Sequence, residues 1–260
     1  MLRLIQRQPP PPRTRSPIST AMPSRIPLSL VFLALCAAPL RAEEAPAPPA
    51  ADILKEARLT ASLQQGDLDG NLECNDTKIP FRLSMAEGKL SFAFKAPDEQ
   101  FTLDLGDEAF RFSETRDGKS NPMALDKYAR QIRNTDVTYE DIALRFLFWP
   151  SAQVLGTDRF KDRPAWKLRI NNPRNEGLYA VVYAWIDKET SALMKVQGYN
   201  WKGRCVKQFE VTDVMKVGDN WMLKAMRVET LDGNDKVASR TYLRLDKPAD
   251  KPTGRRPGWE

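Results

Sequence analysis

The chain of 260 residues contains no histidine, and its 40 basic and 34 acidic residues give a formal net charge of +6. Without histidine, neither a Ser-His-Asp triad nor a histidine metal site can be built, and neither GxGxxG nor GxxxxGK[ST] occurs in the sequence. These absences argue against common hydrolases, nucleotide-binding enzymes and metalloproteins. We therefore expect a protein without catalytic activity, metal or other cofactor.

Residues 1–42 have the layout of a secretory signal peptide with an N-terminal extension. Arg25 precedes an apolar run at 26–38, and Ala42 is a small residue at a cleavage point. The run of 13 residues is shorter than the roughly 20 that a membrane-spanning helix needs. We therefore expect a cleaved signal peptide and a periplasmic protein, with Met22 as an alternative start. An amphipathic tail or a short membrane anchor is the alternative interpretation.

Cleavage would change the charge of the protein. Six arginines are the only charged residues in 1–42, so the rest of the chain carries 34 basic and 34 acidic residues. A protein that binds nucleic acid is expected to keep a basic surface after maturation. The resulting formal charge of zero argues against a nucleic-acid partner.

Proline is concentrated near the two ends of the chain. Residues 43–51 are typical of a Pro/Ala linker and residues 248–260 of a flexible tail. We expect a single domain over 52–247, because a core of that size is too small to suggest two. A short helix begins this domain, with Asp52 as its cap and with apolar residues at helical spacing: Ile53, Leu54, Ala57 and Ala61.

The next fifty residues alternate between apolar and polar side chains. The apolar positions are Leu68, Leu72, Ile79, Phe81, Leu83, Met85, Leu90, Phe92, Phe94, Phe101, Leu103, Leu105, Phe110 and Phe112. Turn residues interrupt the alternation at 75–76, 87–88, 97–98 and 106–107. This period of two predicts an antiparallel meander with one apolar and one polar face. The apolar face of such a sheet must be covered.

The middle of the chain interrupts this pattern. Residues 117–136 contain polar turns and a predicted short helix at 124–132. Thr138 and Asp141 then form a capping box, with Asp in place of the usual Glu. They open a predicted helix over 139–149 whose apolar residues lie nearly all round it. We expect such a helix to be buried, or to lie between a sheet and another apolar group.

The second half returns to strands, predicted at 166–170, 179–186, 193–201, 205–217, 221–229 and 237–245. In total we expect about eleven strands and three helices, without a βαβ rhythm. The predicted fold class is mainly antiparallel β (α+β), a curved half-barrel with helices covering its concave face. Cys74 and Cys205 lie on separate strands, and we expect them to be buried and unpaired, although export would permit a disulfide.

Four stretches of the sequence carry a family resemblance. TYEDI at 138–142 is similar to an (S/T)-Y-E-D-(L/I) helix entry, and VLGTD at 154–158 with WKLRI at 166–170 is similar to a strand pair. YAWIDKET at 183–190, with the residues up to Gly203, is similar to the signature (V/L)-W-(V/I)-D-K-E-T … P-x-K-(V/A)-x-x-Y-D-x-x-G. NWM at 220–222 stands where G-x-W-(V/I)-P is usual, with leucine in place of the proline. Over residues 52–245 the chain resembles the LolA-like superfamily of outer-membrane lipoprotein-sorting proteins.

The resemblance implies an unclosed β-barrel whose concave face, capped by helices, receives the acyl chains of lipoproteins in transit across the periplasm. It implies an acyl chain as the ligand and an inner-membrane exporter as a candidate partner, and we expect a monomer. The arginine that holds the lid shut in the family cannot be placed from the motifs. Arg82 and Arg111 are candidates through their positions on strands.

The predicted ligand site is an apolar cavity between the meander and the helix at 139–149. We expect its wall to comprise Phe81, Leu83, Phe92, Phe94, Phe101, Leu103, Phe110 and Phe112, and its lid to comprise Ile142, Phe146 and Leu147. An acyl chain in such a cavity would gain about 0.8 kcal/mol for each buried methylene. The alternative is that these aromatic residues form an ordinary core.

The expected function is a periplasmic carrier or sorting protein for lipids or lipoproteins. An envelope-stress sensor or regulatory binding module on the same fold is the alternative. Trp185, Trp201 and Trp221 could line a sugar-binding face, although strand anchors are the simpler interpretation. Asp187 and Glu189 could form an acid/base pair, but we expect a solvated hairpin turn.

Overall fold

A computed structural model describes residues 46–95, 97–106 and 109–248. The predicted signal peptide and residues 249–260 of the predicted tail lie outside the described residues. No helix of the described part is long and apolar enough to cross a membrane.

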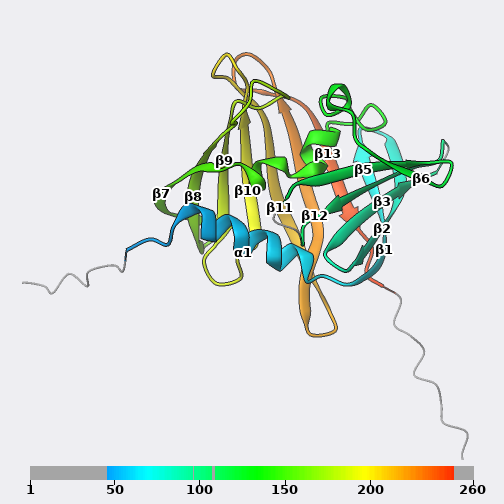
Figure 1. Ribbon diagram of the computed structural model, residues 1–260, viewed down its shortest axis with the longest axis horizontal. Coiled ribbons are helices and arrows are strands. Elements are labelled where there is room, and N and C mark those ends of the chain that lie inside the picture. Colours follow the sequence, from blue (N-terminus) through cyan, green and yellow to red (C-terminus); the bar gives the residue numbers. More distant parts are fainter. Residues whose placement is uncertain (1–45, 96, 107–108, 249–260) are drawn as a thin grey trace, which may run out of the picture. The chain divides into compact units, whose positions relative to one another are not determined.

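Thirteen antiparallel strands form one open, curved sheet (Figure 1). The strands are β1 (Gly66–Cys74), β2 (Thr77–Ala86), β3 (Lys89–Phe94), β4 (Glu99–Asp104), β5 (Arg111–Arg116), β6 (Lys119–Pro122), β7 (Ser151–Phe160), β8 (Arg163–Asn171), β9 (Val181–Asp187), β10 (Leu193–Tyr199), β11 (Cys205–Val217), β12 (Asn220–Leu231) and β13 (Val237–Leu245). They run in the order β6-β5-β4-β3-β2-β1-β13-β12-β11-β10-β9-β8-β7. The first strand therefore pairs with the last, and this pairing joins the two halves of the chain into one sheet.

The predicted antiparallel β class is confirmed, but the expected number of eleven strands is wrong. The additional strands are β6 and β7, which form the two edges of the sheet. All four residues of β6 are exposed, so it has no apolar alternation by which to recognise it. β7 alternates between exposed and half-buried residues, and only the resemblance indicated a strand there.

The helices differ more from expectation than the strands. α1 spans Ala50–Ser62, so it begins within the predicted linker, and Pro49 rather than Asp52 is its N-cap residue. Two alanines after a proline favour this earlier start, because proline fixes φ near the helical value and alanine has the highest helix propensity. The predicted face is confirmed for Ile53, Leu54 and Ala57, which are buried, whereas Ala61 is half-buried.

The predicted helix over 139–149 is broken in two. The capping box of Thr138 and Asp141 is confirmed and opens α2 (Tyr139–Ala143). Leu144 then adopts a left-handed conformation, with φ 46° and ψ 31°, and the 3-10 helix η2 (Arg145–Phe148) follows. A residue in this conformation cannot continue an α-helix.

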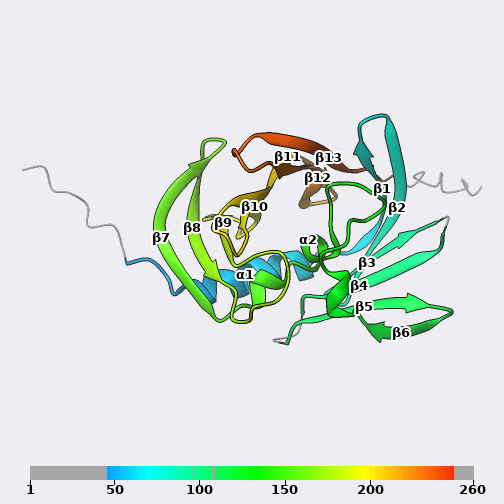
Figure 2. The same ribbon diagram turned by 90° about the horizontal axis from the view of Figure 1, so that it is seen from above.

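The predicted helix at 124–132 is also shorter than expected, because only the 3-10 helix η1 (Leu125–Lys127) forms there. α1 and α2 both lie inside the curve of the sheet when the protein is seen from above (Figure 2). Buried residues of both helices join the hydrophobic core formed by the inner faces of the strands. Cys74 and Cys205 are both unpaired; Cys205 is buried as expected, but Cys74 is half-buried.

Asp187 organises the turn between β9 and β10 and is almost fully buried. Its carboxylate accepts hydrogen bonds from the main-chain N–H and the hydroxyl of Thr190, both at 2.8 Å, and pairs with Arg163 at 2.7 Å. Glu189 is exposed and contacts the same arginine at 3.0 Å. The turn is confirmed, but Asp187 is buried in it rather than solvated. The two carboxylates share a cation and do not face a cleft.

This arrangement predicts a dependence of stability on pH. The hydrogen bonds from Arg163 and Thr190 lower the pKa of Asp187 from 3.8 to about 2. The ionised carboxylate therefore stabilises the fold above about pH 4, and this contribution is lost as the pH falls toward 2. Between pH 4 and pH 2, we expect the free energy of unfolding of the wild-type protein to fall by about 2 kcal/mol more than that of Asp187→Asn.

Urea unfolding at a series of pH values measures this loss. Glu189→Gln is the matched control, because it changes an exposed carboxylate on the same arginine and should keep the wild-type profile. An unchanged pH profile for Asp187→Asn would contradict the assigned role of the turn.

Candidate functional site

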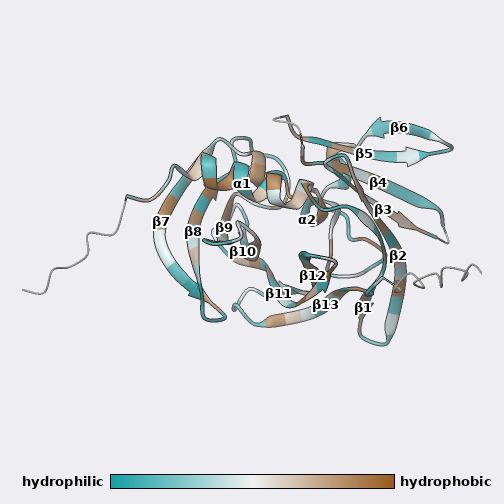
Figure 3. Cartoon of the chain, turned by 90° about the horizontal axis from the view of Figure 1, so that it is seen from below, coloured by the Kyte–Doolittle hydropathy of each residue, from teal (hydrophilic) through white to brown (hydrophobic). Residues whose placement is uncertain are grey.

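An apolar cavity of about 240 Å³ lies between the helices and the inner face of the sheet. Its wall is formed by Ala61, Gln64, Leu83, Met85, Leu90, Phe92, Val137, Asp141, Ile142, Leu144, Phe146, Leu193, Met194, Lys195, Val196, Phe209, Glu210, Val211, Met222, Leu223, Met226, Val228, Leu243 and Leu245. Twenty of these 24 residues are apolar. Figure 3 shows α1 and α2 on one side of the interior and β11–β13 on the other, with hydrophobic residues on both sides.

Part of the predicted site lies on this wall. Of the predicted wall residues, Leu83 and Phe92 line the cavity, and of the predicted lid residues, Ile142 and Phe146 do so. Leu147 is buried but faces the core rather than the cavity. The other predicted residues, namely Phe81, Phe94, Phe101, Leu103, Phe110 and Phe112, pack in the core away from the cavity wall.

A cluster of aromatic rings explains why the meander side of the interior is filled. Phe101 is fully buried, and its ring centroid lies 5.5 Å from that of Phe92, 5.6 Å from that of Phe94 and 5.8 Å from that of Phe112. The ring of Tyr139, at the start of α2, lies edge-on to Phe101 at 5.4 Å. Rings at these separations are in favourable contact. The free space therefore lies toward the second half of the sheet.

Strands β10–β13 supply many wall residues that we did not predict. Val196, Phe209, Val228 and Leu243 point inward from these four strands and line the cavity. Their alternation with polar neighbours was a usable signal, since it is the same period of two that identified the meander. Four methionines also line the wall: Met85, Met194, Met222 and Met226. Methionine side chains adapt to irregular space, which suits a wall that must fit a flexible ligand.

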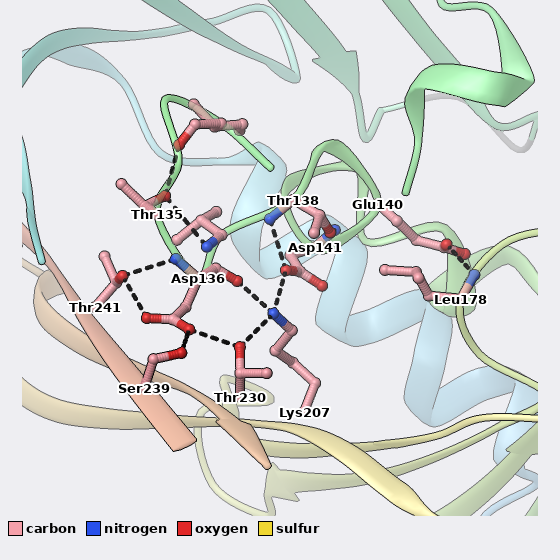
Figure 4. A network of polar contacts seen from close by, with 12 residues as sticks. Thr135, Asp136, Thr138, Glu140, Asp141, Leu178, Lys207, Thr230, Ser239 and Thr241 are labelled. Atoms are coloured by element: carbon pink, nitrogen blue, oxygen red, sulfur yellow. Dashed lines mark hydrogen bonds and ion pairs between the residues drawn. The ribbon is translucent and has the colours of Figure 1, made fainter. Parts of the chain in front are cut away.

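A buried polar network fixes the segment that leads into α2 (Figure 4). The carboxylate of Asp136 accepts hydrogen bonds from three hydroxyl groups on β12 and β13, those of Thr230 at 2.6 Å, Thr241 at 2.9 Å and Ser239. The Lys207 ammonium on β11 donates to the main-chain oxygen of Asp136 and lies 4.0 Å from the Asp141 carboxylate. Polar groups buried in this way must be paired, so the network holds the segment on the sheet.

Two carboxylates of α2 extend this anchoring. Glu140 accepts from the main-chain N–H of Leu178 at 2.6 Å and from Arg145 at 2.9 Å. Asp141 accepts from the main-chain N–H of Thr138 at 2.8 Å and from the hydroxyl of Tyr179. Burial raises the pKa of both carboxylates, and burial beside Asp141 raises the pKa of Tyr179. Asp141 lies on the cavity wall, but its oxygens are occupied by these structural contacts.

Gly198 makes the position of Tyr179 possible. A Cβ atom at this glycine on β10 would overlap the Tyr179 ring. The ring can therefore lie flat against the strand and direct its hydroxyl to Asp141. Gly198, which lies in the motif around 194–199, therefore allows the contact between Tyr179 and Asp141 that positions α2.

The proposed lid arginines lie elsewhere. Arg82 pairs with Asp67 and Asp69 on the exposed face, and Arg111 lies on β5 with its side chain exposed. Arg58 of α1 instead donates to the main-chain oxygen of Leu147 at 2.7 Å, with its guanidinium 4.5 Å from the Phe148 ring centroid. An arginine thus links α1 to η2, but it comes from a helix that the motifs did not single out.

The tryptophans do not form one sugar-binding face. Trp185 is buried on β9 between Lys167 and Lys195, and it donates to Asp158 at 2.8 Å. Trp201 and Trp221 are exposed at the two opposite ends of β11. Within the described residues, no group of three or more Cys, Asp or Glu side chains could hold a metal ion. The cavity has a geometry suited to an apolar ligand.

Similar proteins agree with this fold. A putative outer membrane lipoprotein-sorting protein domain from Vibrio parahaemolyticus is 16% identical and has a TM-score of 0.58, with 76% of this chain and 90% of that chain covered. A LolA superfamily protein from Nitrosomonas europaea is 16% identical, with a TM-score of 0.55 and coverage of 79% and 96%. A DUF1329 family protein from Desulfovibrio piger is 14% identical, with a TM-score of 0.55 and coverage of 77% and 92%.

A search of curated proteins finds no match. A family model described as "Uncharacterized protein" matches residues 119–249, which is half of the chain. The chain therefore belongs to the family of that model, and its fold is that of the LolA-like lipoprotein-sorting proteins.

Proposed function

We propose that the protein is an exported carrier that holds an acyl chain of a lipid or lipoprotein in its cavity within the periplasm. The observation that carries this proposal is the cavity of about 240 Å³ with 20 apolar residues among the 24 of its wall. Apolar cavities favour apolar guests over water, because water needs two to four polar partners. An acyl chain needs none.

The size of the cavity fits part of one acyl chain. One water molecule takes about 30 Å³ of liquid volume, so the space would hold roughly eight groups of that size. Eight buried methylenes would contribute about 6 kcal/mol before the cost of association. A longer chain would require the adaptable methionine side chains or the covering helices to move.

We further propose that α1, α2 and η2 together form the lid of this cavity. α2 is the fixed part, because Asp136 binds the segment before it to β12, and Glu140 and Asp141 bind it to the residues that lead into β9. α1 crosses the interior with Ile53, Leu54 and Ala57 buried, and Arg58 links it to η2. Displacement of α1 would expose the cavity without breaking the buried network of α2.

A carrier of this kind needs no catalytic group, cofactor or nucleic acid. It does need a membrane source of acyl chains, and an inner-membrane exporter is a candidate partner for loading. One protomer contains the entire cavity wall, so a monomer would suffice.

Phe146→Ala and its neighbour Leu147→Ala test the site directly. Both side chains are buried, but Phe146 lines the cavity and Leu147 does not. We expect Leu147→Ala to cost about 2–5 kcal/mol of stability and to leave binding by the folded protein unchanged. Phe146→Ala should cost less than the about 3–5 kcal/mol usual for a buried phenylalanine, because one side of its ring already borders free space.

Titration with fluorescent fatty acids of increasing chain length measures the effect on binding. Phe146→Ala enlarges the cavity, so we expect a shift of at least severalfold in favour of longer chains. Val182→Ala, at a fully buried position of β9 outside the cavity wall, provides a second control that should change stability alone. The proposal fails if the wild-type protein binds no acyl probe, or if all three variants only lose stability.

The anchoring of α2 can be tested at Asp136. Removal of its carboxylate by Asp136→Ala leaves three hydroxyl groups, of which that of Thr241 is fully buried, without their common acceptor. We expect a loss of about 3 kcal/mol in the free energy of unfolding, measured by urea denaturation. Asp213→Ala removes an exposed carboxylate that pairs with Lys224 and should leave stability close to that of wild type. Equal effects of the two substitutions would contradict the anchor.

A further inference from the structure

We propose that the rim of the cavity docks onto the surface of a phospholipid bilayer through Leu63, Val214 and Trp221. This inference rests on the proposed acyl-chain function, because it supplies the route by which a chain would enter. The exposed fractions of the three residues are 75%, 45% and 63%. Large apolar side chains that are exposed to this extent at the edge of one cavity often mark an interaction site.

The three residues come from three elements, the end of α1 and the strands β11 and β12, and each of these elements lines the cavity. Leu63 follows α1 and lies between Ala61 and Gln64, which are wall residues. Trp221 lies at the start of β12 and directly precedes Met222 and Leu223, which are also wall residues. Of these two, Leu223 shares the face of Trp221, whereas Met222 points to the opposite face of the strand, so Trp221 extends the wall beyond Leu223.

The hairpin of β11 and β12 presents its apolar residues on one face. Trp221 pairs across the strands with Lys216, and Leu223 pairs with Val214. Because side chains two residues apart in a strand point to the same side, these four residues share one face of the hairpin. Figure 1 shows that this hairpin extends beyond α1, so its end is accessible.

The composition of this rim favours a bilayer over a protein partner. Even a fully exposed aromatic side chain buries only about 150–250 Å². Of the three residues only Trp221 is aromatic, and all three are partly covered, so together they fall short of the roughly 800 Å² per partner that a stable protein interface buries. A tryptophan at the boundary of headgroups and acyl chains is favourable, because its ring is apolar and its N–H is polar. Lys216 can keep its ammonium group among the headgroups beside it.

The charges of the hairpin indicate how the contact would depend on lipid composition. Asp213 and Lys224 form an ion pair at 2.7 Å, and Lys216 and Asp219 add one charge of each sign. The hairpin segment 213–224 therefore has no net charge. We expect docking that depends on apolar contact, so anionic lipid should not be required and salt should not abolish it.

Trp201 provides a matched control. It is also exposed, at 46%, and its indole N–H donates to the main-chain oxygen of Gly177. It lies in the turn before β11, whereas Trp221 follows the turn after β11. The 13 residues of this strand separate the two turns by about 40 Å.

Flotation of the protein with vesicles tests this proposal. Vesicles of phosphatidylcholine alone, and of phosphatidylcholine mixed with phosphatidylglycerol, should carry similar fractions of the wild-type protein at low and high salt. Trp221→Ala and Leu63→Ser should each reduce the bound fraction at least fivefold, while Trp201→Ala should leave it unchanged. Urea denaturation should show wild-type stability for all three variants, because these side chains are exposed.

Two results would overturn the docking surface. One is equal vesicle binding by Trp221→Ala and Trp201→Ala. The absence of vesicle binding by the wild-type protein counts as the same result, because no difference between the variants could then be seen. The other is binding that requires phosphatidylglycerol and disappears at high salt, since this would indicate electrostatic adsorption.

Binding of a monomeric fatty-acid probe without vesicles separates this proposal from the carrier function. Trp221→Ala should bind the probe as wild type does, because Trp221 lies outside the cavity wall. Loss of probe binding by the wild-type protein would count against the carrier function, while the vesicle result alone decides the docking surface.

Discussion

The inner face of one open sheet of thirteen strands is apolar and has to be covered, and the rest of the structure depends on how it is covered. An antiparallel sheet tolerates water on one face only, because its other face carries the hydrophobic side chains. Buried residues of α1 and of the segment from Met123 to Trp149 join the hydrophobic core at this face. Aromatic rings fill the side near β3–β5, and a cavity remains on the side of β10–β13.

Polar contacts fix the position of α2 and of the segment that leads into it, in an otherwise apolar interior. Buried carboxylates are unfavourable unless they are paired, so Asp136, Glu140 and Asp141 specify one arrangement in which all their partners are met. The hydroxyl groups of β12 and β13 are the partners of Asp136. Glu140 accepts from Arg145 and the main-chain N–H of Leu178, and Asp141 accepts from Thr138 and Tyr179. A segment held by apolar contacts alone could take several positions on the sheet, but the hydrogen bonds of these carboxylates require one geometry. The volume of the cavity is therefore a consequence of the polar network as much as of the apolar residues.

Much of the fold could be predicted from the sequence, because strand alternation and the capping box of Thr138 and Asp141 are local signals. The break of the helix at Leu144 could not, since leucine rarely adopts a left-handed conformation and nothing in its neighbours requires it. The alternation of apolar and polar residues also did not identify the edge strands β6 and β7, because exposed strands need no apolar residues at alternate positions.

The candidate site was predicted only in part for a related reason. Alternation identifies which residues face the interior, but it cannot say which of them touch the cover and which border free space. Leu83 and Phe92 border the cavity, whereas Phe94 and Phe101 are packed against other rings. That distinction arises from the tertiary position of α2 and Tyr139, which long-range hydrogen bonds to β11–β13 determine.

The most direct measurement of the central claim is mass spectrometry of lipids extracted from the protein after its isolation from a bacterial envelope. The cavity account predicts about one acyl chain per protein molecule. It also predicts loss of that lipid in Ala61→Phe, which places a ring at the cavity wall. The absence of any acyl lipid in the wild-type protein, or an equal amount in the filled variant, would contradict the account.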